Sequence, residues 1–435
     1  MPLLCWGFTL ALLHTLLHTA HSTLPDSSLN ATEVVYSGPE RAGLYLGSPS
    51  ILRCPTSSLL LISHDTFGSQ ASGSYLSTSS NNGTTWQPAG STKGTYWATL
   101  FSRPGDPAIY ALGTSTLPSS QVVISRSLDC GSTFSPPTPL TSSPHPYSTG
   151  PTPVLLHHNR LWRAFELNAA PGWASGYSSL VLSIAANATS LLDPSAWTVS
   201  SALPFSAVSS LVPPTWSNPS VLSTFGWLEG NAVAPVAADD PGIHIVLRVN
   251  SLPAGNKAAL LYLASPTAAP SLVSFIDFPG GMSKFTIRRD TGSGLYLSLV
   301  NPVADESVTH PPLCAPLNAT ASSPSAPLPC CSMNQVLACT PAPCLWCHAN
   351  ARNVLSLATS PDLLTWSTST PPLLTDDTAQ PGWLSELTTG FQYVDFVQEG
   401  RDLLAAVRAG YRGSQNYHNS NRILFMRVAD WAERS

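Results

Sequence analysis

The chain has 435 residues and a net charge of −5 at pH 7, and only 10% of its residues are charged. Soluble domains usually contain about 25% charged residues, so we expect serine, threonine, proline and glycine to cover much of this surface. Such a composition offers no basic face, and we therefore expect no nucleic-acid partner.

An apolar stretch lies near the start of the chain. Residues 6–20 read WGFTLALLHTLLHTA and run into AHS at residues 20–22. We interpret residues 1–22 as a signal peptide, which leaves residues 23–435 as a single secreted domain. A membrane anchor is the alternative, but the stretch is short for a spanning helix and contains two histidines. No later run reaches the ~18 apolar residues that a spanning helix needs, so we expect no membrane span.

Two short segments repeat one turn pattern. Residues 79–86 read SSNNGTTW and residues 127–134 read SLDCGSTF, which share Ser-x-Asn/Asp-x-Gly-x-Thr-aromatic. In such a turn the Asn or Asp side chain accepts backbone hydrogen bonds, and glycine supplies a positive φ. The two copies start 48 residues apart (127 − 79), and repeats of about 40–50 residues are typical of propeller blades.

Short apolar, β-branched runs separated by turn residues dominate the chain, which predicts an all-β fold. Turn signals recur at intervals of 46 to 72 residues. They are centred on Asn81, Asp129, Asp193, Asp239, Asp290 and Asp362. This spacing predicts a six-bladed β-propeller with four strands in each blade. A five-bladed propeller and a two-domain sandwich are the alternatives.

The chain has nine cysteines, of which one lies in the predicted signal peptide. The remaining eight are an even number, which suits an oxidising compartment. Cys54 and Cys130 are candidates to pair with each other. The other six lie within residues 304–349, which we interpret as a disulfide-rich insertion. Its segment CLWCH also matches a haem attachment pattern, but disulfides are the preferred interpretation, and we expect no cofactor and no metal. Glycosylation sequons occur at Asn30, Asn82, Asn187 and Asn318.

In its repeated turns and their spacing, the chain resembles the sialidase (neuraminidase) superfamily, whose propellers carry turns of this kind called Asp boxes. The resemblance covers roughly residues 36–430. It implies a glycoside hydrolase in which three arginines bind the carboxylate of the substrate. It also implies an acidic residue as acid/base and a tyrosine nucleophile activated by a glutamate.

The later family motifs have counterparts in this chain. The segment GWLEGNAVAPVAADDPGIHIVLRVN is similar to a family strand pair and offers Glu229 and Arg248. A hairpin of this length would return Arg248 beside Glu229, although a plain cross-strand salt bridge would have the same spacing. Arg352, before SPDLLTW, matches the third arginine, and Tyr393, in GFQYVDF, matches the nucleophile. A neutral tyrosine avoids the repulsion that a carboxylate would feel from an anionic sugar.

The acid/base candidate is Asp65, at the end of the apolar segment LLLISHDTFG. An Asx turn at the end of a strand is the structural alternative. The first family arginine is missing, because Gly47 in YLGSPSI stands in its place, and neither Arg41 nor Arg53 is in register. Other cations could bind the substrate instead. They are Lys284, Arg288 and Arg163.

Strand alternation adds further candidates. It places Lys284, Thr286 and Arg288 on one face, and it places Asp395 on the side of Tyr393 as an alternative carboxylate. His418 is a candidate sugar hydrogen-bond donor or general acid, with a purely structural histidine as the alternative. The tryptophans that could stack on a sugar are Trp97, Trp227 and Trp383.

The sequence therefore predicts a secreted glycoside hydrolase of sialidase-like type that releases terminal sialic acid or a related acidic sugar from a glycan. Its catalytic residues would be Asp65, Glu229 and Tyr393, and its substrate-binding residues would be Arg248, Arg352, Lys284, Arg163 and His418. Two alternatives stay open. One is a five-bladed arabinanase- or fructosidase-like glycosidase that uses Asp65, Glu166 and Glu229, and the other is a non-catalytic carbohydrate-binding propeller.

Overall fold

The computed structural model describes most of the chain after the predicted signal peptide. The described residues are 29–38, 44–68, 73–92, 94–115, 120–216, 225–251, 254–303, 350–380 and 382–434. The predicted signal peptide and the predicted disulfide-rich insertion therefore lie outside the described residues. Among the residues that are described, no helix is long and apolar enough to cross a membrane.

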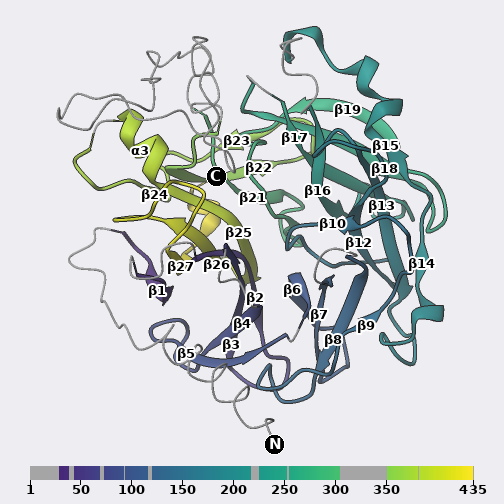
Figure 1. Ribbon diagram of the computed structural model, residues 1–435, viewed down its shortest axis with the longest axis horizontal. Helices are drawn as coiled ribbons and strands as arrows, with labels where there is room; N and C mark the ends of the chain where they lie inside the picture. Colours follow the sequence, from purple (N-terminus) through teal and green to yellow (C-terminus); the bar gives the residue numbers. More distant parts are fainter. Residues whose placement is uncertain are drawn as a thin grey trace, which may run out of the picture.

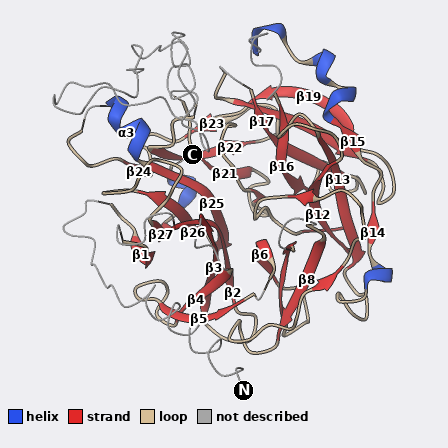
Figure 2. Cartoon of the chain, in the orientation of Figure 1, coloured by secondary structure: helices blue, strands red, loops and turns tan. Residues whose placement is uncertain are grey.

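The described strands form six antiparallel sheets, which are arranged as blades around one central axis (Figure 1). Helix is confined to α3 (Gly382–Thr388) and to short 3-10 turns, so the described chain is almost entirely strand and loop (Figure 2). The predicted six-bladed propeller is confirmed. The five-bladed and sandwich alternatives are wrong.

The blades are numbered here in chain order, and their strands run from the axis outward. Blade 1 contains β2 (Leu44–Arg53), β3 (Leu60–Gly68), β4 (Ser74–Ser79) and β5 (Gln87–Ser91). Blade 2 contains β6 (Tyr96–Phe101), β7 (Ile109–Thr114), β8 (Val122–Ser127) and β9 (Thr138–Pro139). Blade 3 contains β10 (Tyr147–Ser148), β12 (Arg160–Asn168), β13 (Tyr177–Ala185) and β14 (Thr198–Val199), with β11 (Leu155–His157) and β15 (Leu203–Pro204) beside them.

Blade 4 contains β16 (Gly226–Val233), β17 (Ile243–Asn250), β18 (Lys257–Leu263) and β19 (Ser271–Asp277). Blade 5 contains β20 (Ile287–Arg289), β21 (Tyr296–Val300), β22 (Val354–Ser360) and β23 (Ser367–Thr368), with β24 (Leu374–Thr375) on β22. Blade 6 contains β25 (Gly390–Glu399), β26 (Asp402–Gly410), β27 (Arg422–Val428) and β1 (Thr32–Tyr36). Because β1 is the outermost strand of blade 6, the two ends of the domain pair with each other and close the circle.

The repeated turn has the same hydrogen bonds in each copy. The Asn81 side chain accepts a hydrogen bond from the backbone amide of Thr85 at 2.9 Å, and the Asp129 side chain accepts one from the backbone amide of Thr133 at 2.8 Å. The turn at residues 360–366 does the same through Asp362, with Leu363 at φ 67° where the other copies have glycine. All three turns join the third and fourth strands of their blades.

The six turn signals are not equivalent and do not mark one blade each, because Asp290 and Asp362 both lie in blade 5 and none of the six lies in blade 6. The turn at Asp193 also joins a third strand to a fourth, but those at Asp239 and Asp290 join a first strand to a second. Asp290 still accepts the amide of Ser293, at 2.6 Å. Short Asx-type turns therefore leave the same composition signal at the inner hairpin and at the outer hairpin of a blade.

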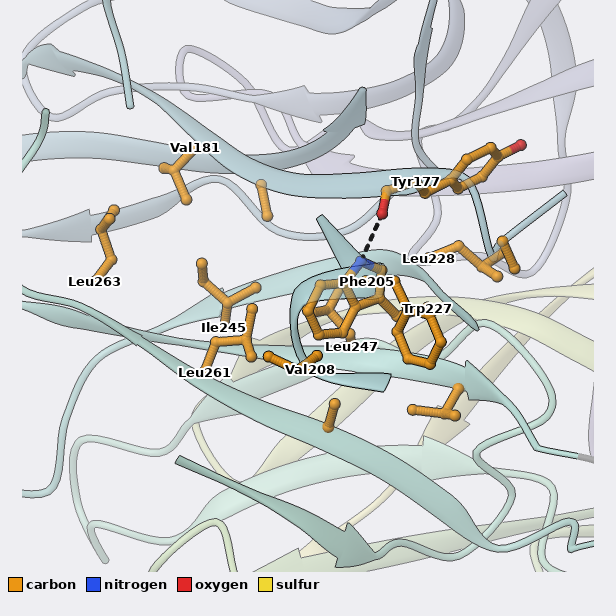
Figure 3. Close-up of a cluster of buried hydrophobic side chains, with 14 of the residues drawn as sticks. Tyr177, Val181, Phe205, Val208, Trp227, Leu228, Ile245, Leu247, Leu261 and Leu263 are labelled. Atoms are coloured by element: carbon orange, nitrogen blue, oxygen red, sulfur yellow. Dashed lines mark hydrogen bonds between the residues drawn. The ribbon is translucent and has the colours of Figure 1, made fainter. Parts of the chain in front are cut away.

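Apolar cores fill the spaces between neighbouring blades. The largest lies between blades 3 and 4, where Trp227 packs edge-on against Phe205 and donates to the carbonyl of Tyr177 at 3.1 Å (Figure 3). Trp227 is fully buried, so its predicted role in sugar stacking is wrong. The predicted Cys54–Cys130 disulfide is confirmed and joins blade 1 to the loop that ends blade 2's third strand.

Buried hydrogen bonds connect each blade to the next around the axis. In blade order, the contacts are Leu100 amide to Ser50 hydroxyl at 3.0 Å, Thr99 hydroxyl to Thr152 carbonyl at 2.6 Å, Thr152 hydroxyl to Gly230 carbonyl at 2.8 Å, Ile287 amide to Asn231 side chain at 3.0 Å, Thr286 hydroxyl to Val394 carbonyl at 2.9 Å, and Ser50 hydroxyl to Asp395 at 2.8 Å. We call this set the inter-blade ring. It closes the circle with polar contacts where the blades converge.

Removing Asp395 from this ring should destabilise the fold. Asp395→Ala would leave the Ser50 hydroxyl, the Ile51 amide and the Arg288 guanidinium without their buried acceptor. We expect a loss of roughly 3 kcal/mol, since a buried charge partner is removed, measured by chemical denaturation. The control is Asp277→Ala. The Asp277 side chain is 83% exposed beside Lys257, so this variant should have the same free energy of unfolding as the wild type. Equal effects of the two substitutions would contradict the role of the ring.

Candidate active site

Four inner strands of the described chain share one irregularity. In β2, β6, β16 and β25 the pairing register shifts at a bulge. Each bulge holds a non-glycine residue with positive φ. These residues are Ser48 at 50°, Trp97 at 49°, Glu229 at 58° and Tyr393 at 53°. Such backbone costs about 1–3 kcal/mol per residue and is found where a side chain must be redirected. Two predicted catalytic residues, Glu229 and Tyr393, thus occupy the same strained position in different blades.

The second strands place charged groups next to these bulges. The residue before the bulge pairs with Asp65 in blade 1, Arg248 in blade 4 and Arg408 in blade 6, and with the uncharged Thr114 in blade 2. Because the blades repeat the same geometry, the three charged residues lie at equivalent positions around the axis. The fold therefore gathers them, together with Glu229 and Tyr393, at one end of the propeller.

Arg248 connects the predicted nucleophile to the predicted glutamate. Its Nη1 donates to Glu229 at 2.9 Å and to the Tyr393 hydroxyl at 3.1 Å. The predicted return of Arg248 beside Glu229 is confirmed. The ion pair is almost buried, with side-chain exposures of 1% and 7%, whereas Tyr393 is partly exposed. One guanidinium thus orients both the carboxylate and the phenol.

Two more guanidinium groups surround Tyr393. Arg408 lies 4.9 Å and Arg352 5.8 Å from the centre of the tyrosine ring. Burial lowers the pKa of Arg352 to about 10, which still leaves it charged at neutral pH. Within the described residues, the Nε atoms of Arg248 and Arg352 have no hydrogen-bond partner. Three guanidinium groups around one ring, of which Arg248 is paired with Glu229, are donors that could hold an anion.

Arg408 places a guanidinium beside position 47, where the resemblance to sialidases leads us to expect an arginine. A side chain there would meet the Phe67 ring at 2.7 Å and the Arg408 Nη1 atom at 3.1 Å. The guanidinium therefore lies beside the place of the missing family arginine, but it comes from β26 rather than β2. Sequence reasoning missed it because RDLLAAVRAG looks like an ordinary core strand. The available signal was a lone arginine in a run of buried small and apolar residues.

His418 supports the arginines through its backbone. Its carbonyl accepts a hydrogen bond from Arg408 at 2.5 Å, and its ring contacts Tyr45 and the side chain of Asn419. Burial and the nearby charges of Arg408 and Arg352 hold the pKa of the imidazole well below its usual value. A neutral imidazole is a poor general acid, so the geometry favours the structural alternative for His418.

Asp65 lies in a setting suited to a general acid. Its carboxylate accepts hydrogen bonds from the Ser74 hydroxyl and, at 3.2 Å, from the Trp97 amide. These partners come from other strands, so the Asx-turn alternative is wrong. Asp65 is only 1% exposed, and burial raises its pKa to about 7 although Ser74, Trp97 and Arg408 act in the opposite direction.

The other predicted cations do not join the three arginines. Lys284 donates to the Thr286 hydroxyl and the Val394 carbonyl, each at 2.9 Å. Arg163 donates to the carbonyls of Gly150 at 2.6 Å and Ala164 at 2.7 Å. Both side chains are buried, and burial lowers their pKa values to about 8 and about 9. Lys284 connects blade 5 to blade 6, whereas Arg163 binds carbonyls within its own blade 3.

Strand alternation gave one right and one wrong placement. Lys284, Thr286 and Arg288 do share a face, since all three donate to carbonyls of β25. Asp395 does not face the arginines with Tyr393, because the bulge between them breaks the alternation. It belongs to the inter-blade ring instead.

Glu166 is buried below the site. Its Oε1 accepts the amide of Gly230 at 2.9 Å, and its Oε2 has no hydrogen-bond partner among the described residues. The side chain is 0% exposed, and burial raises its pKa to about 7. Its hydrogen bond holds it to the backbone of blade 4 and not to Tyr393 or to one of the three arginines, so this contact is structural, whereas the arabinanase-like alternative assigns it a catalytic role.

Aromatic side chains flank the charged groups. Trp97 is partly exposed, as stacking on a sugar would require, and its ring stacks on Phe67. Trp173, which the sequence analysis did not single out, is 43% exposed and lies 5.8 Å from the Arg248 guanidinium. The side chain of Trp383 lies outside the described part of the structure. In the ranges described, no three His, Cys, Asp or Glu side chains are grouped to hold a metal ion.

Comparison with known proteins establishes the fold. No family model and no curated protein sequence matches the chain. A Hadza microbial sialidase, Hz136, superimposes with a TM-score of 0.56 at 12% identity, over 93% of this chain and 69% of the other. An α-L-arabinanase from Penicillium chrysogenum superimposes with a TM-score of 0.53 at 12% identity, over 94% of this chain and 100% of the other. A variant of NanB sialidase from Streptococcus pneumoniae superimposes with a TM-score of 0.53 at 10% identity, over 92% of this chain and 71% of the other. The chain therefore shares the β-propeller fold of these glycosidases.

Glu166→Gln should change how stability depends on pH. The folded carboxyl holds its proton up to about pH 7, whereas the unfolded one releases it near 4.5. Wild-type stability should thus fall as pH rises through this window, since the folded state binds more protons. The variant keeps the Oε1 acceptor but cannot ionise. Its free energy of unfolding should therefore rise relative to that of the wild type by up to ~1.4 kcal/mol for each pH unit through this window. Urea denaturation across the window measures this, and parallel stability curves would contradict the buried carboxyl.

Proposed function

We propose that the protein is a glycoside hydrolase that releases terminal sialic acid, or a related sugar with a carboxylate, from glycans. The observation that carries the proposal is the convergence of Arg248, Arg352 and Arg408 on Tyr393. Guanidinium groups bind carboxylates through paired, charge-assisted hydrogen bonds. A carboxylate on the sugar would hold its anomeric carbon beside the phenol and would relieve the repulsion among the arginines.

Tyr393 is the nucleophile in this mechanism. Its hydroxyl oxygen attacks the anomeric carbon as the bond to the leaving oxygen breaks, and Glu229 takes the phenolic proton. Arg248 stabilises the developing phenolate, because its Nη1 already donates to the hydroxyl. A phenol repels an anionic sugar less than a carboxylate nucleophile would.

Asp65 supplies the proton that the leaving oxygen needs. With a pKa of about 7 it holds this proton in neutral and mildly acidic solution. After the leaving group departs, the ionised carboxylate removes a proton from water, which attacks the same carbon and releases Tyr393. Burial thus prepares one acid for both halves of the reaction.

The protein is proposed to act outside the cell. The predicted signal peptide supports this, as does the Cys54–Cys130 disulfide. The sequon residues Asn30, Asn82 and Asn187 are all exposed, as glycosylation requires.

The alternatives fit the site less well. A five-bladed glycosidase does not match the six blades, and the carboxylate set with Glu166 needs a side chain that is held by the backbone amide of Gly230. A binding protein without activity would not need Tyr393 and Glu229 on the same guanidinium. It remains the outcome to exclude by experiment.

Activity on sialosides tests the proposal directly. We expect the full chain, produced in a secreting host, to hydrolyse fluorogenic sialosides or those of the deaminated sugar. Tyr393→Phe should lower kcat by about 100-fold or more, because the nucleophilic oxygen is lost. Circular dichroism would verify that both proteins fold. A folded wild type that releases no acidic sugar but still binds glycans would be a binding protein, and the proposal would fail.

Arg408→Met should weaken binding of the acidic sugar in particular. We expect KM to rise by about 30-fold, which corresponds to ~2 kcal/mol, because a buried guanidinium that faces the carboxylate is removed. The control is Arg427→Met, whose guanidinium is 52% exposed and pairs with Asp402, and which should keep the wild-type KM. If Arg408→Met kept it too, Arg408 would not replace the missing arginine.

A further inference from the structure

A row of stacked aromatic rings runs from the arginines to the acid. Tyr45 lies 5.6 Å from the Arg408 guanidinium, and its ring stacks on Phe67 with centroids 5.4 Å apart and an interplanar angle of 25°. Phe67 in turn stacks on Trp97, at 6.5 Å and 28°. All three side chains are partly exposed. We call Tyr45, Phe67 and Trp97 the aromatic row.

The row lies beside Asp65 on two sides. Tyr45 and Phe67 face each other across β2 and β3, one pleat from the pair that Gly47 makes with Asp65. Trp97 donates its backbone amide to the Asp65 carboxylate. It does so from the strained bulge of β6, where φ is 49°. The fold thus holds a partly exposed tryptophan against the acid at a cost in backbone energy.

Gly47 makes room for this row. A Cβ atom at that position would meet the Phe67 ring at 2.7 Å. The absence of the family arginine and the presence of the row are therefore one feature, since an arginine at position 47 and Phe67 in its present place exclude each other. Arg408 supplies the charge, and β2 and β3 present aromatic surface instead.

We propose that the Phe67–Trp97 end of the aromatic row binds the leaving group, and that this leaving group is a sugar. The proposal rests on the proposed function, in which Asp65 protonates the leaving oxygen. A group that protonates this oxygen must contact it, so the surface next to Asp65 and away from Tyr393 faces the leaving side of the bond. Pyranose rings expose C–H faces, and flat aromatic rings bury such faces well.

Trp173 offers a matched control. It is also an exposed tryptophan, but it packs on Arg248 at the side of Glu229. Its loop is held by backbone hydrogen bonds, such as that from Gly176 to Gly172 at 3.0 Å. A change at Trp173 should therefore act on the acidic sugar itself, whatever the leaving group.

Kinetics with two leaving groups test the proposal. Wild type, Trp97→Leu and Trp173→Leu would be assayed on sialyllactose and on methyl sialoside by the acidic sugar that they release. We expect Trp97→Leu to lower kcat/KM for sialyllactose by about 10-fold relative to methyl sialoside, because only lactose can stack. Trp173→Leu should change both substrates by the same factor. An unchanged ratio in Trp97→Leu, in an enzyme that hydrolyses both, would overturn the leaving-group site and leave the proposed function intact.

A binding measurement separates the two proposals further. Lactose would be titrated into wild type and Trp97→Leu, with tryptophan fluorescence and saturation-transfer NMR as readouts. Wild type should bind lactose and Trp97→Leu should bind it about 10-fold more weakly, even if no sialoside is hydrolysed. No lactose binding by the folded wild type would overturn the leaving-group site. Hydrolysis without a Trp97 effect would do the same.

Discussion

The inter-blade ring is the constraint on which the site depends. A propeller has no common core, so the relative positions of its blades are set where they converge on the axis. There Ser50, Asn231 and Asp395 connect neighbouring blades through buried hydrogen bonds. Each lies two residues after a bulge residue with positive φ. The contacts that close the circle therefore also fix Glu229 and Tyr393, which belong to blades that are far apart in the sequence.

In the proposed site the three guanidinium groups repel one another, and an anionic substrate would reduce this repulsion. Arg248, Arg352 and Arg408 are all nearly buried, and only Arg248 has a carboxylate within ion-pair distance in the described chain. Aromatic rings cover the other two, with Tyr417 at 5.3 Å from Arg352 and Tyr45 at 5.6 Å from Arg408. Ring faces attract cations but do not neutralise them. An anion that binds here meets preorganised donors and needs little rearrangement of the protein.

The buried charged residues near the axis form two groups with different partners. The first group contains the three arginines around Tyr393, which is itself partly exposed. The second group contains Arg163, Glu166 and Lys284, which bind backbone carbonyls and amides. Glu166 and Lys284 connect neighbouring blades, and Arg163 binds within blade 3. Both groups look alike in the sequence, where each member is a polar residue in an apolar strand. Both groups are buried to the same extent, so only their partners distinguish them.

The sequence by itself determined the repeated turn, because the turns at Asn81, Asp129 and Asp362 depend on local hydrogen bonds within a few residues. The predicted number of six blades is right although two of the signals lie in blade 5 and none lies in blade 6. The sequence also determined the neighbourhood of Glu229 and Arg248, since one hairpin connects them. Only the tertiary structure decided that Arg408 stands beside Gly47, since these residues lie 361 positions apart (408 − 47) and meet across the closure of the circle. The bulges were equally hidden, because the register shift between Gln392 and Asp395 breaks the strict alternation that placed Asp395 on the side of Tyr393.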